Sequence, residues 1–370
     1  MPPVPTRRFD RFALDLGRGV VLTLLALLPF ALAELAARLL SVPPPIRRVY
    51  DPFAYRIPQP GLVDSFVGPD GQPVTIRLNE LGMRGPSTTE KVAPDTSTLV
   101  FLGGSTTENY AYPDADTFPA IIGDAVAEKL GHPVRVWNAG ASAATSGVSL
   151  GRLQHQVLDL QPSLVVVMHG INDLLGGFHP GFRPDSRHLV RPALADHRPR
   201  SYLLTWVRGL RSRVVQPSSA RTREAFEFRR FPARLVFERN IRSMAAIATA
   251  HGIPILFLSQ PTMFRLDTAP ADAKRFRLAR SLRDVGATPP DVPSLSRGMR
   301  AFNATTLALP SERGGKAFDL AARMSQSWKW FYDECHYTRE GNRRVAAELS
   351  PVVTEILRSA ESAPRRARRR

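Results

Sequence analysis

Short apolar runs alternate with helical patterns along most of the chain after residue 96. Apolar residues at helical spacing fill the segments between the runs. Strands that alternate with helices form parallel sheets that are covered on both faces. We therefore predict an α/β fold, a three-layer doubly wound parallel sheet. The predicted strands are Thr98–Leu102, Val134–Trp137, Leu164–Met168, Pro254–Leu258 and the weaker Ala317–Leu320. The predicted helices are Phe118–Leu130, Val148–Leu160, Phe237–His251 and Thr338–Leu357.

The segment Gly19–Leu40 has a different pattern, because no polar face interrupts its apolar core. A helix of this length spans about 33 Å, which is enough to cross a bilayer. The Arg residues that precede it favour an N-terminus inside the cytoplasm. We expect residues 1–42 to be a membrane anchor, with the rest of the chain outside the cytoplasm. The small-x-small site Ala31-Leu32-Ala33 supports an alternative, a cleaved signal peptide and a secreted product.

The remaining organisation follows from shifts in composition. Residues 43–95 are predicted to be an extended linker with a short strand at Val74–Leu78. The main domain, 96–360, carries two inserts at about 176–233 and 263–311, and residues 361–370 are predicted to be a basic disordered tail. Long inserts of this kind are either lids or rims around a site, or padding without contact to it. The sequence leaves both interpretations open.

The chain is strongly basic, with 50 Lys and Arg against 33 Asp and Glu and a formal net charge of +17. No nucleic-acid motif accompanies the charge, so we expect no nucleic-acid partner and attribute the Arg content to a GC-rich coding sequence. The first insert holds 12 Arg against four Asp or Glu, and an anionic membrane or glycan facing it is the alternative. Cys335 is the single Cys, which excludes an intramolecular disulfide and a multi-cysteine metal site.

Residues with useful chemistry follow the predicted strands. Ligands bind beyond the carboxyl ends of the strands in an open parallel sheet. Gly103-Gly104-Ser105 follows the first strand, Asn138-Ala139-Gly140 the second and His169-Gly170-Ile171-Asn172-Asp173 the third, while Asp333 and His336 precede the last helix. A hydroxyl, backbone and amide donors and a carboxylate–imidazole pair are the groups that acyl transfer through an activated Ser requires.

These residues resemble the SGNH/GDSL hydrolase family. The resemblance covers about 97–357 and implies a flavodoxin-like sheet. The upstream turn NELGMRG at 79–85 is also similar to the stretch that precedes this domain in exported bacterial members. The family's four blocks are matched in order by GGST at Gly103–Thr106, NAG at Asn138–Gly140, GIND at Gly170–Asp173 and DECH at Asp333–His336.

The resemblance implies a role for each matched residue. Ser105 would be the nucleophile, His336 the general base and then the general acid, and Asp333 the group that orients His336. The backbone N–H groups of Ser105 and Gly140 and the side-chain amide of Asn172 would form the oxyanion hole. Such a mechanism requires no cofactor and no metal.

Several residues need separate interpretation. Gly104 departs from the family pattern, because it stands where the Asp of the GDSL block would be, so local hydrogen bonding must differ there. Ser149 lies in a G-x-S-x-G motif, but this motif must join a strand directly to a helix, and here we expect Ser149 in the first turn of a helix. We interpret His169 as structural, although it could line the site, and Cys335 as a packing residue that points away from Asp333 and His336.

We therefore expect an extracytoplasmic serine esterase that cleaves carboxylic esters through an acyl-enzyme. The alternatives are an O-acyltransferase that acts on glycan hydroxyls and a non-catalytic envelope binding module. The expected partners are the membrane, through the N-terminal helix, and an ester substrate. The sequence does not decide between small-molecule, glycan and lipid esters, and it does not give the oligomeric state.

Overall fold

The computed structural model describes residues 7–40, 47–184, 201, 203–204, 227–277 and 289–362. The predicted linker prolines, the basic tail and most of the first insert lie outside these residues. The chain divides into two compact units. One comprises residues 1–45 and 196–222, and the other comprises 46–195 and 223–370.

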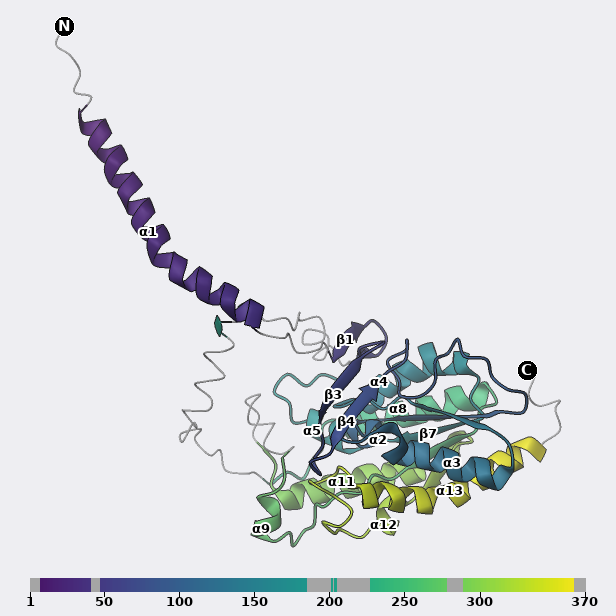
Figure 1. Cartoon of the computed structure of the whole chain (residues 1–370). Helices are drawn as coiled ribbons and strands as arrows, with labels where there is room; N and C mark the ends of the chain where they lie inside the picture. Colours follow the sequence, from purple (N-terminus) through teal and green to yellow (C-terminus); the bar gives the residue numbers. More distant parts are fainter. Residues whose placement is uncertain are drawn as a thin grey trace. The chain divides into compact units, whose positions relative to one another are not determined.

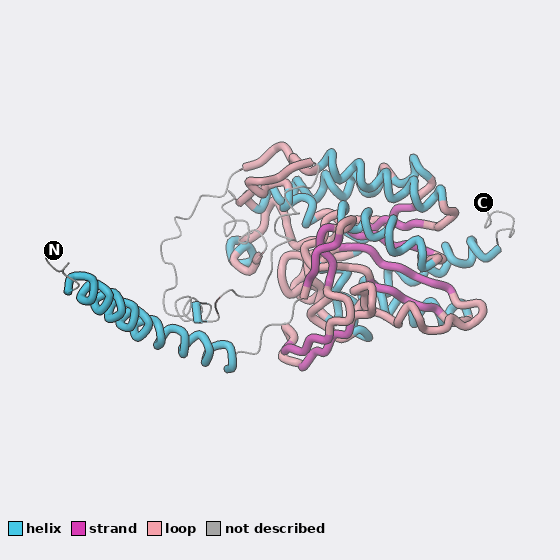
Figure 2. Tube along the Cα trace, turned by 90° about the horizontal axis from the view of Figure 1, so that it is seen from above, coloured by secondary structure: helices cyan, strands magenta, loops and turns pink. Residues whose placement is uncertain are grey.

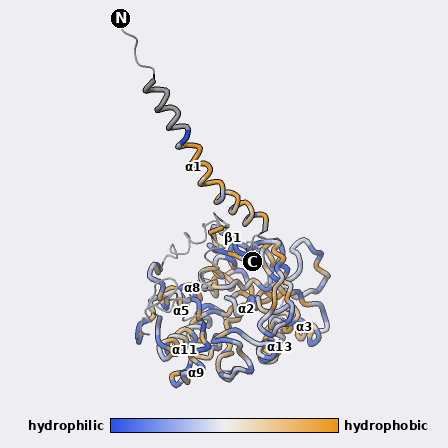
Figure 3. The backbone as a smooth tube through the Cα atoms, turned by 60° about the vertical axis from the view of Figure 1, so that its left-hand side comes forward, coloured by the Kyte–Doolittle hydropathy of each residue, from blue (hydrophilic) through white to orange (hydrophobic). Residues whose placement is uncertain are grey.

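The first unit contains the helix α1, Arg7–Leu40. Within it, Arg18–Leu39 has a mean hydropathy of 2.3, and it is the one stretch of the described chain that is long and apolar enough to cross a membrane. Figure 3 shows this stretch as mainly hydrophobic. Near its end, the Glu34 carboxylate accepts hydrogen bonds from Arg38 Nε and from Ser201 Oγ, at 2.8 and 2.7 Å. A signal sequence has the same length and hydropathy, so the helix alone indicates either an anchor or a signal.

The second unit is built on a parallel sheet of five strands in the order β6-β5-β7-β8-β9. Figure 1 labels the middle strand of this order, β7. This is the flavodoxin-like order, so the predicted fold class is confirmed. Every residue of β5 and β7 is buried, as expected where helices cover both faces of a sheet. The strands are β5 Ser97–Gly103, β6 Val134–Asn138, β7 Leu164–Met168, β8 Ile255–Leu258 and β9 Lys316–Phe318.

Helices lie on both sides of the sheet (Figure 2). The helices α3 and α13 pack against each other, and α8 packs against α4 and α11. Each long helix buries apolar residues three or four positions apart, such as Phe118, Ile122 and Val126 of α3, which is the pattern of one core-facing stripe. The helices are α2 Ser105–Glu108, α3 Phe118–Leu130, α4 Ser146–Arg152, α5 Ile171–Gly176, α8 Arg234–Ala250, α9 Pro270–Ala273, α11 Val292–Ala308, α12 Leu320–Arg323 and α13 Arg339–Ser362. Short 3₁₀ helices are Asp114–Asp116, Leu158–Leu160 and Pro310–Arg313, and Leu153–Val157 is a π-helix that follows α4 directly.

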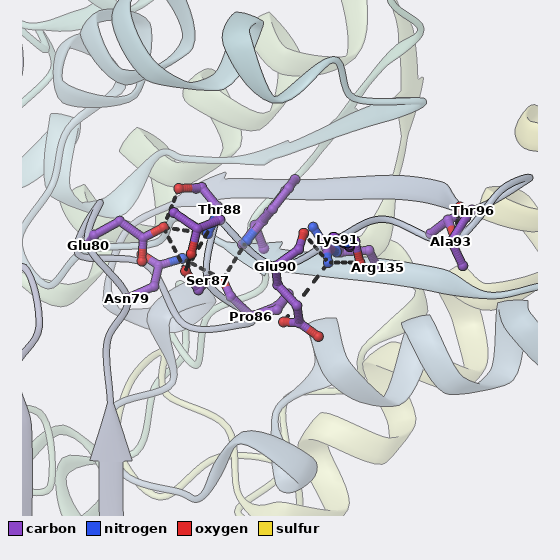
Figure 4. A network of polar contacts seen from close by, with 12 residues as sticks. Asn79, Glu80, Pro86, Ser87, Thr88, Glu90, Lys91, Ala93, Thr96 and Arg135 are labelled. Carbon is purple, nitrogen blue, oxygen red and sulfur yellow. Dashed lines mark hydrogen bonds and ion pairs between the residues drawn. The ribbon is translucent and has the colours of Figure 1, made fainter.

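The segment expected to be a linker is structured from residue 47 onward. It forms two antiparallel hairpins, β1 Arg48–Asp51 with β2 Tyr55–Pro58, and β3 Val63–Val67 with β4 Pro73–Arg77. Only β4 was predicted, because four- and five-residue strands between Pro- and Gly-rich turns carry little periodic signal. The chain that follows lies along β6 (Figure 4): the Trp137 indole and the Asn79 amide both donate to the carbonyl of Pro86 at 2.9 Å.

The segment 263–311, predicted as the second insert, contains a long helix. Its C-terminal part contains α11, whose Leu295, Met299 and Phe302 belong to the main core. Three prolines, Pro289, Pro290 and Pro293, lie at or just before the start of this helix. Asp291 caps it by accepting a hydrogen bond from Ser294 N at 2.7 Å, and Pro293 occupies its first turn, where a missing N–H costs nothing.

Candidate active site

Ser105 is placed by the central strand of the sheet. It is the first residue of α2, and Gly104 separates it from the end of β5. The Ser105 hydroxyl lies 2.7 Å from His336 Nε2. Because Ser105 begins a helix, its backbone N–H has no acceptor within that helix and points beyond the helix end. The same residue therefore presents a hydroxyl beside an imidazole and a backbone donor.

Asp333 and His336 lie in the loop before α13. His336 Nδ1 is 2.8 and 2.9 Å from the two carboxylate oxygens of Asp333. The backbone N–H groups of Cys335 and His336 also donate to Asp333 Oδ1, at 3.0 and 2.8 Å. Burial would raise the pKa of the Asp333 carboxyl, but its hydrogen bond and charge interaction with His336 hold that pKa below its ordinary value. Asp333 is therefore ionised at neutral pH, and it fixes the imidazole with Nε2 toward Ser105.

The other two predicted oxyanion donors lie close to Ser105 in the fold, but both already donate hydrogen bonds. Asn172, in α5 after β7, donates from Nδ2 to the Ala144 carbonyl at 2.9 Å. An amide nitrogen carries two protons, so one remains for a ligand. Gly140 N donates to Asn138 Oδ1 at 3.0 Å, and an oxyanion there must share or replace that acceptor. Asn172 is therefore the donor with a proton to spare.

The departure at Gly104 has a steric explanation. A Cβ atom on Gly104 would lie 2.5 Å from Asn172 Nδ2, which is far inside van der Waals contact. Any side chain at this position would displace the amide of Asn172. The absence of a side chain at Gly104 therefore allows the Asn172 amide to lie close to the start of α2.

Arg84 holds α2 from its other end, a role that the sequence analysis missed. Its buried guanidinium donates to the carbonyls of Glu108 and Asn109 at 2.8 Å and to that of Tyr112 at 2.6 Å. Asn138 Nδ2 adds a bond to the Thr107 carbonyl at 2.7 Å. These groups satisfy the carbonyls at the C-terminus of a four-residue helix that would be marginal alone. Arg84 lies in the turn at 79–85, and the only signal for it was the resemblance of that turn.

A buried carboxylate lies under the same loop. Glu108 accepts a hydrogen bond from the Ser142 hydroxyl, and a Cβ on Gly140 would lie 2.3 Å from Glu108 N. Burial raises the pKa of Glu108 above its ordinary value, against the opposing influence of Ser142, Arg48 and Arg84. The loop that carries Gly140 is thus packed directly onto the end of α2.

Ser149 and His169 form a second serine–histidine pair that is closed to solvent. Ser149 lies within α4 and its hydroxyl is 2.7 Å from His169 Nε2. The two residues are 1% and 3% exposed. Burial lowers the pKa of His169 to about 3 and raises that of Asp173 to about 7. Asp173 accepts hydrogen bonds from both the backbone and the hydroxyl of Ser146, at 3.0 and 2.5 Å. This network joins α4 to α5, the helix that carries Asn172.

Cys335 is fully buried, as expected of a packing residue, but it does not point away from the pair. Its Sγ lies 3.5 Å from His336 Nδ1. Among the described residues, the one group with side chains close enough to bind a metal ion is Asp333, Cys335 and His336, whose ligand atoms lie within 4.8 Å. Burial raises the pKa of the Cys335 thiol well above its ordinary value, so the thiol is protonated at neutral pH and is a poor nucleophile.

Comparison with known proteins identifies the family. Residues 101–344 match the sequence model of the GDSL-like lipase/acylhydrolase family. The chain belongs to this family. An arylesterase of Vibrio mimicus is 37% identical over 82 residues, which are 22% of this chain and 40% of that protein.

Solved structures of GDSL-type proteins are similar at lower identity. A lipase/acylhydrolase from Enterococcus faecalis is 15% identical with a TM-score of 0.41, over 70% of this chain and 96% of that one. A GDSL-like lipase from Bacteroides thetaiotaomicron is 17% identical with a TM-score of 0.40, over 74% and 93% of the two chains.

Proposed function

We propose that this GDSL-family chain is a serine esterase in which Ser105, His336 and Asp333 form the catalytic triad. The observation that carries the proposal is the continuous chain of short contacts from the Ser105 hydroxyl through the imidazole to the Asp333 carboxylate. Ser needs an adjacent base, because its own hydroxyl is protonated at neutral pH. His336 is 17% exposed at its side chain, so a substrate can reach this base.

The proposed reaction follows from the position of each group. His336 Nε2 takes the Ser105 proton as Oγ attacks the ester carbonyl, and Asp333 stabilises the imidazolium that forms. The developing oxyanion is bound by the Ser105 N–H, the Gly140 N–H and Asn172 Nδ2. His336 then protonates the leaving alcohol, an acyl-enzyme remains on Ser105, and water activated by the same imidazole releases the acid.

Covalent labelling and turnover test this proposal together. The protein should hydrolyse p-nitrophenyl acetate, and a fluorophosphonate should inactivate it by adding one phosphonyl group to Ser105. Peptide mass spectrometry should find that group on the peptide that contains Gly103–Thr106. Label on the peptide that contains Ser149, or turnover that survives complete labelling, would contradict the assignment.

Gly104→Ala should lower kcat on the order of 10²-fold, because the new methyl group displaces the amide of Asn172. Removal of one oxyanion donor costs about 10²–10³ in kcat. The kcat of Gly104→Ala should therefore not fall below that of Asn172→Ala, which lacks the amide altogether. The double variant should be no slower than Asn172→Ala, since both changes act on the same amide. The control is Gly176→Ala, because a Cβ there meets nothing within 4 Å. Steady-state kinetics that give additive losses would show that Gly104 acts elsewhere.

We also propose that α1 anchors the protein in a membrane with the GDSL domain outside the cytoplasm. The support is the 22-residue apolar stretch Arg18–Leu39 together with the Arg residues before it, since basic residues flanking the first span favour the cytoplasmic side.

Full-length protein should pellet with membranes, and its C-terminal domain should be digested by protease added from outside the cell. Removal of residues 1–42 should give a soluble and active product. A mature N-terminus at Glu34 would instead indicate signal cleavage after Ala33. Intact protein found only in the cytosol would refute both locations.

A further inference from the structure

A pocket of about 510 Å³ opens at the carboxyl edge of the sheet, beyond the end of β8. Its walls come from the loop after β8, from α11 and from α12, and they include Gln260, Phe264, Met299, Asn303 and Gln326. The carboxyl edge is where open parallel sheets bind their ligands. The proposed catalytic residues do not line this pocket.

Hydrogen bonds join the pocket wall to the neighbours of Ser105 and Asn172. Asn303 of α11 exchanges two hydrogen bonds with the backbone of Gln260, at 2.8 and 3.1 Å. The Gln260 side chain accepts from Ile171 N at 2.8 Å and donates to Thr106 Oγ1 at 3.2 Å. Thr106 follows Ser105, and Ile171 precedes Asn172. One wall residue of the pocket, Gln260, therefore contacts the chain neighbours of both Ser105 and Asn172.

Close packing at Gly170 also brings the pocket wall near Asn172. A Cβ on Gly170 would lie 3.0 Å from Met299 Cε and 3.3 Å from Gln260 Oε1. Met299 and Gln260 both line the pocket, so its floor rests on the strand–helix turn that presents Asn172. The pocket and the proposed oxyanion donor Asn172 therefore share a wall, the turn at Gly170.

The charges of the lining favour an anion. Two Arg residues, Arg265 and Arg300, and one acidic residue, Asp267, line the pocket. Arg265 lies 3.7 Å from Asp267 and 3.8 Å from Asp272, so those carboxylates partly neutralise it. Arg300 is exposed on α11, and within the described part of the chain its guanidinium makes no hydrogen bond or ion pair. Arg300 therefore supplies an uncompensated positive charge with planar, bidentate donors.

We propose that this pocket binds an anionic group, a carboxylate or a phosphate, of the ester substrate, with Arg300 as the main contact. The inference rests on the proposed esterase function and narrows its substrate class to esters that carry a negative charge beyond the scissile bond. Asn303 Nδ2 donates one of its two protons to the Gln260 carbonyl, so the other can be donated to the anion. Arg300 is then a specificity-determining residue that does not take part in the chemical step.

Pairs of charged and neutral esters test this inference. On the acyl side, the mono-p-nitrophenyl esters of glutarate and pimelate are compared with p-nitrophenyl butyrate and hexanoate. On the alcohol side, 4-acetoxybenzoate is compared with its methyl ester. In at least one pair, Arg300→Gln should reduce the charged-to-neutral ratio of kcat/KM about tenfold, mainly through KM, and added salt should reduce the parent's ratio. Arg343→Gln is the matched control, because Arg343 lies on α13, is exposed and does not line the pocket.

Calorimetry on Ser105→Ala separates this inference from the esterase proposal. This variant should bind the charged member of the preferred pair, and its combination with Arg300→Gln should bind about tenfold more weakly. If the parent hydrolyses neither ester but Arg300-dependent binding persists, the esterase proposal fails and the anion site stands. If the parent hydrolyses both members while Arg300→Gln changes neither the ratio nor the binding, the anion site is refuted. A neutral glycan ester that outcompetes every charged probe would also refute it.

Discussion

Ser105→Ala should reduce ester turnover roughly 10⁶-fold, which is the scale found when the nucleophile of a serine hydrolase is removed. The hydroxyl is the atom that forms the acyl-enzyme, and no other hydroxyl is hydrogen-bonded to His336 among the described residues. Alanine is a good helix former, so α2 should keep its geometry. Near-ultraviolet circular dichroism and the melting temperature should match the parent, while hydrolysis of p-nitrophenyl acetate falls to background.

Ser149→Ala is the matched control, because it removes the hydroxyl of the other serine–histidine pair. Ser149 is buried and bonded to His169, so the change leaves a buried imidazole nitrogen without its partner. Such a loss costs about 1–3 kcal/mol of stability and should lower the melting temperature. The folded protein should keep most of its turnover. If Ser149→Ala were inactive and Ser105→Ala active, the G-x-S-x-G motif would hold the nucleophile instead.

The regular part of the fold could be predicted because its signals are local and strong. The strand Leu164–Met168 is five consecutive apolar residues, and the structure has it at the same bounds. The positions of Ser105 and Asn172 followed from a rule about strand ends, which needs only the strand assignment. The strands β1, β2 and β3 and the helix α11 were not predicted, because short strands and prolines at a helix start both resemble loops.

Long-range contacts could not be predicted from a single sequence. The steric conflict between Gly104 and Asn172, the Arg84 contacts to α2 and the bonds that tie Gln260 to Asn303 all join residues far apart in the chain. The amino acids next to these residues in the sequence give no sign of these contacts. Gly104 was recognised as a departure from the family block, but its reason required the position of the amide that it makes room for.

Asp333→Asn should lower kcat about 10⁴-fold, because it reverses the hydrogen bond that orients His336. The amide oxygen of Asn can still accept the backbone N–H groups of Cys335 and His336, which both point at Asp333 Oδ1. The amide nitrogen then faces His336 Nδ1 and donates to it. This favours the tautomer with its proton on Nε2, which cannot accept the proton of Ser105.

The pH dependence of stability provides an independent check of the same contact. The pKa of Asp333 in the folded protein lies below its ordinary value. Its carboxylate therefore stabilises the fold above the unfolded pKa of about 4, and this contribution is lost as the pH falls through the folded pKa. The melting temperature of Asp333→Asn should be lower than that of the parent at pH 7, and the difference should shrink below pH of about 4.

A matched substitution separates orientation of His336 from a general effect of losing a carboxylate. Asp291→Asn changes the cap of α11, where Asn is as good a cap as Asp, so turnover and melting temperature should both stay close to the parent values. Steady-state kinetics of the two variants on p-nitrophenyl acetate make the comparison. If Asp333→Asn keeps turnover within tenfold of the parent, then Asp333 does not set the tautomer of His336, and the imidazole must be oriented by another group.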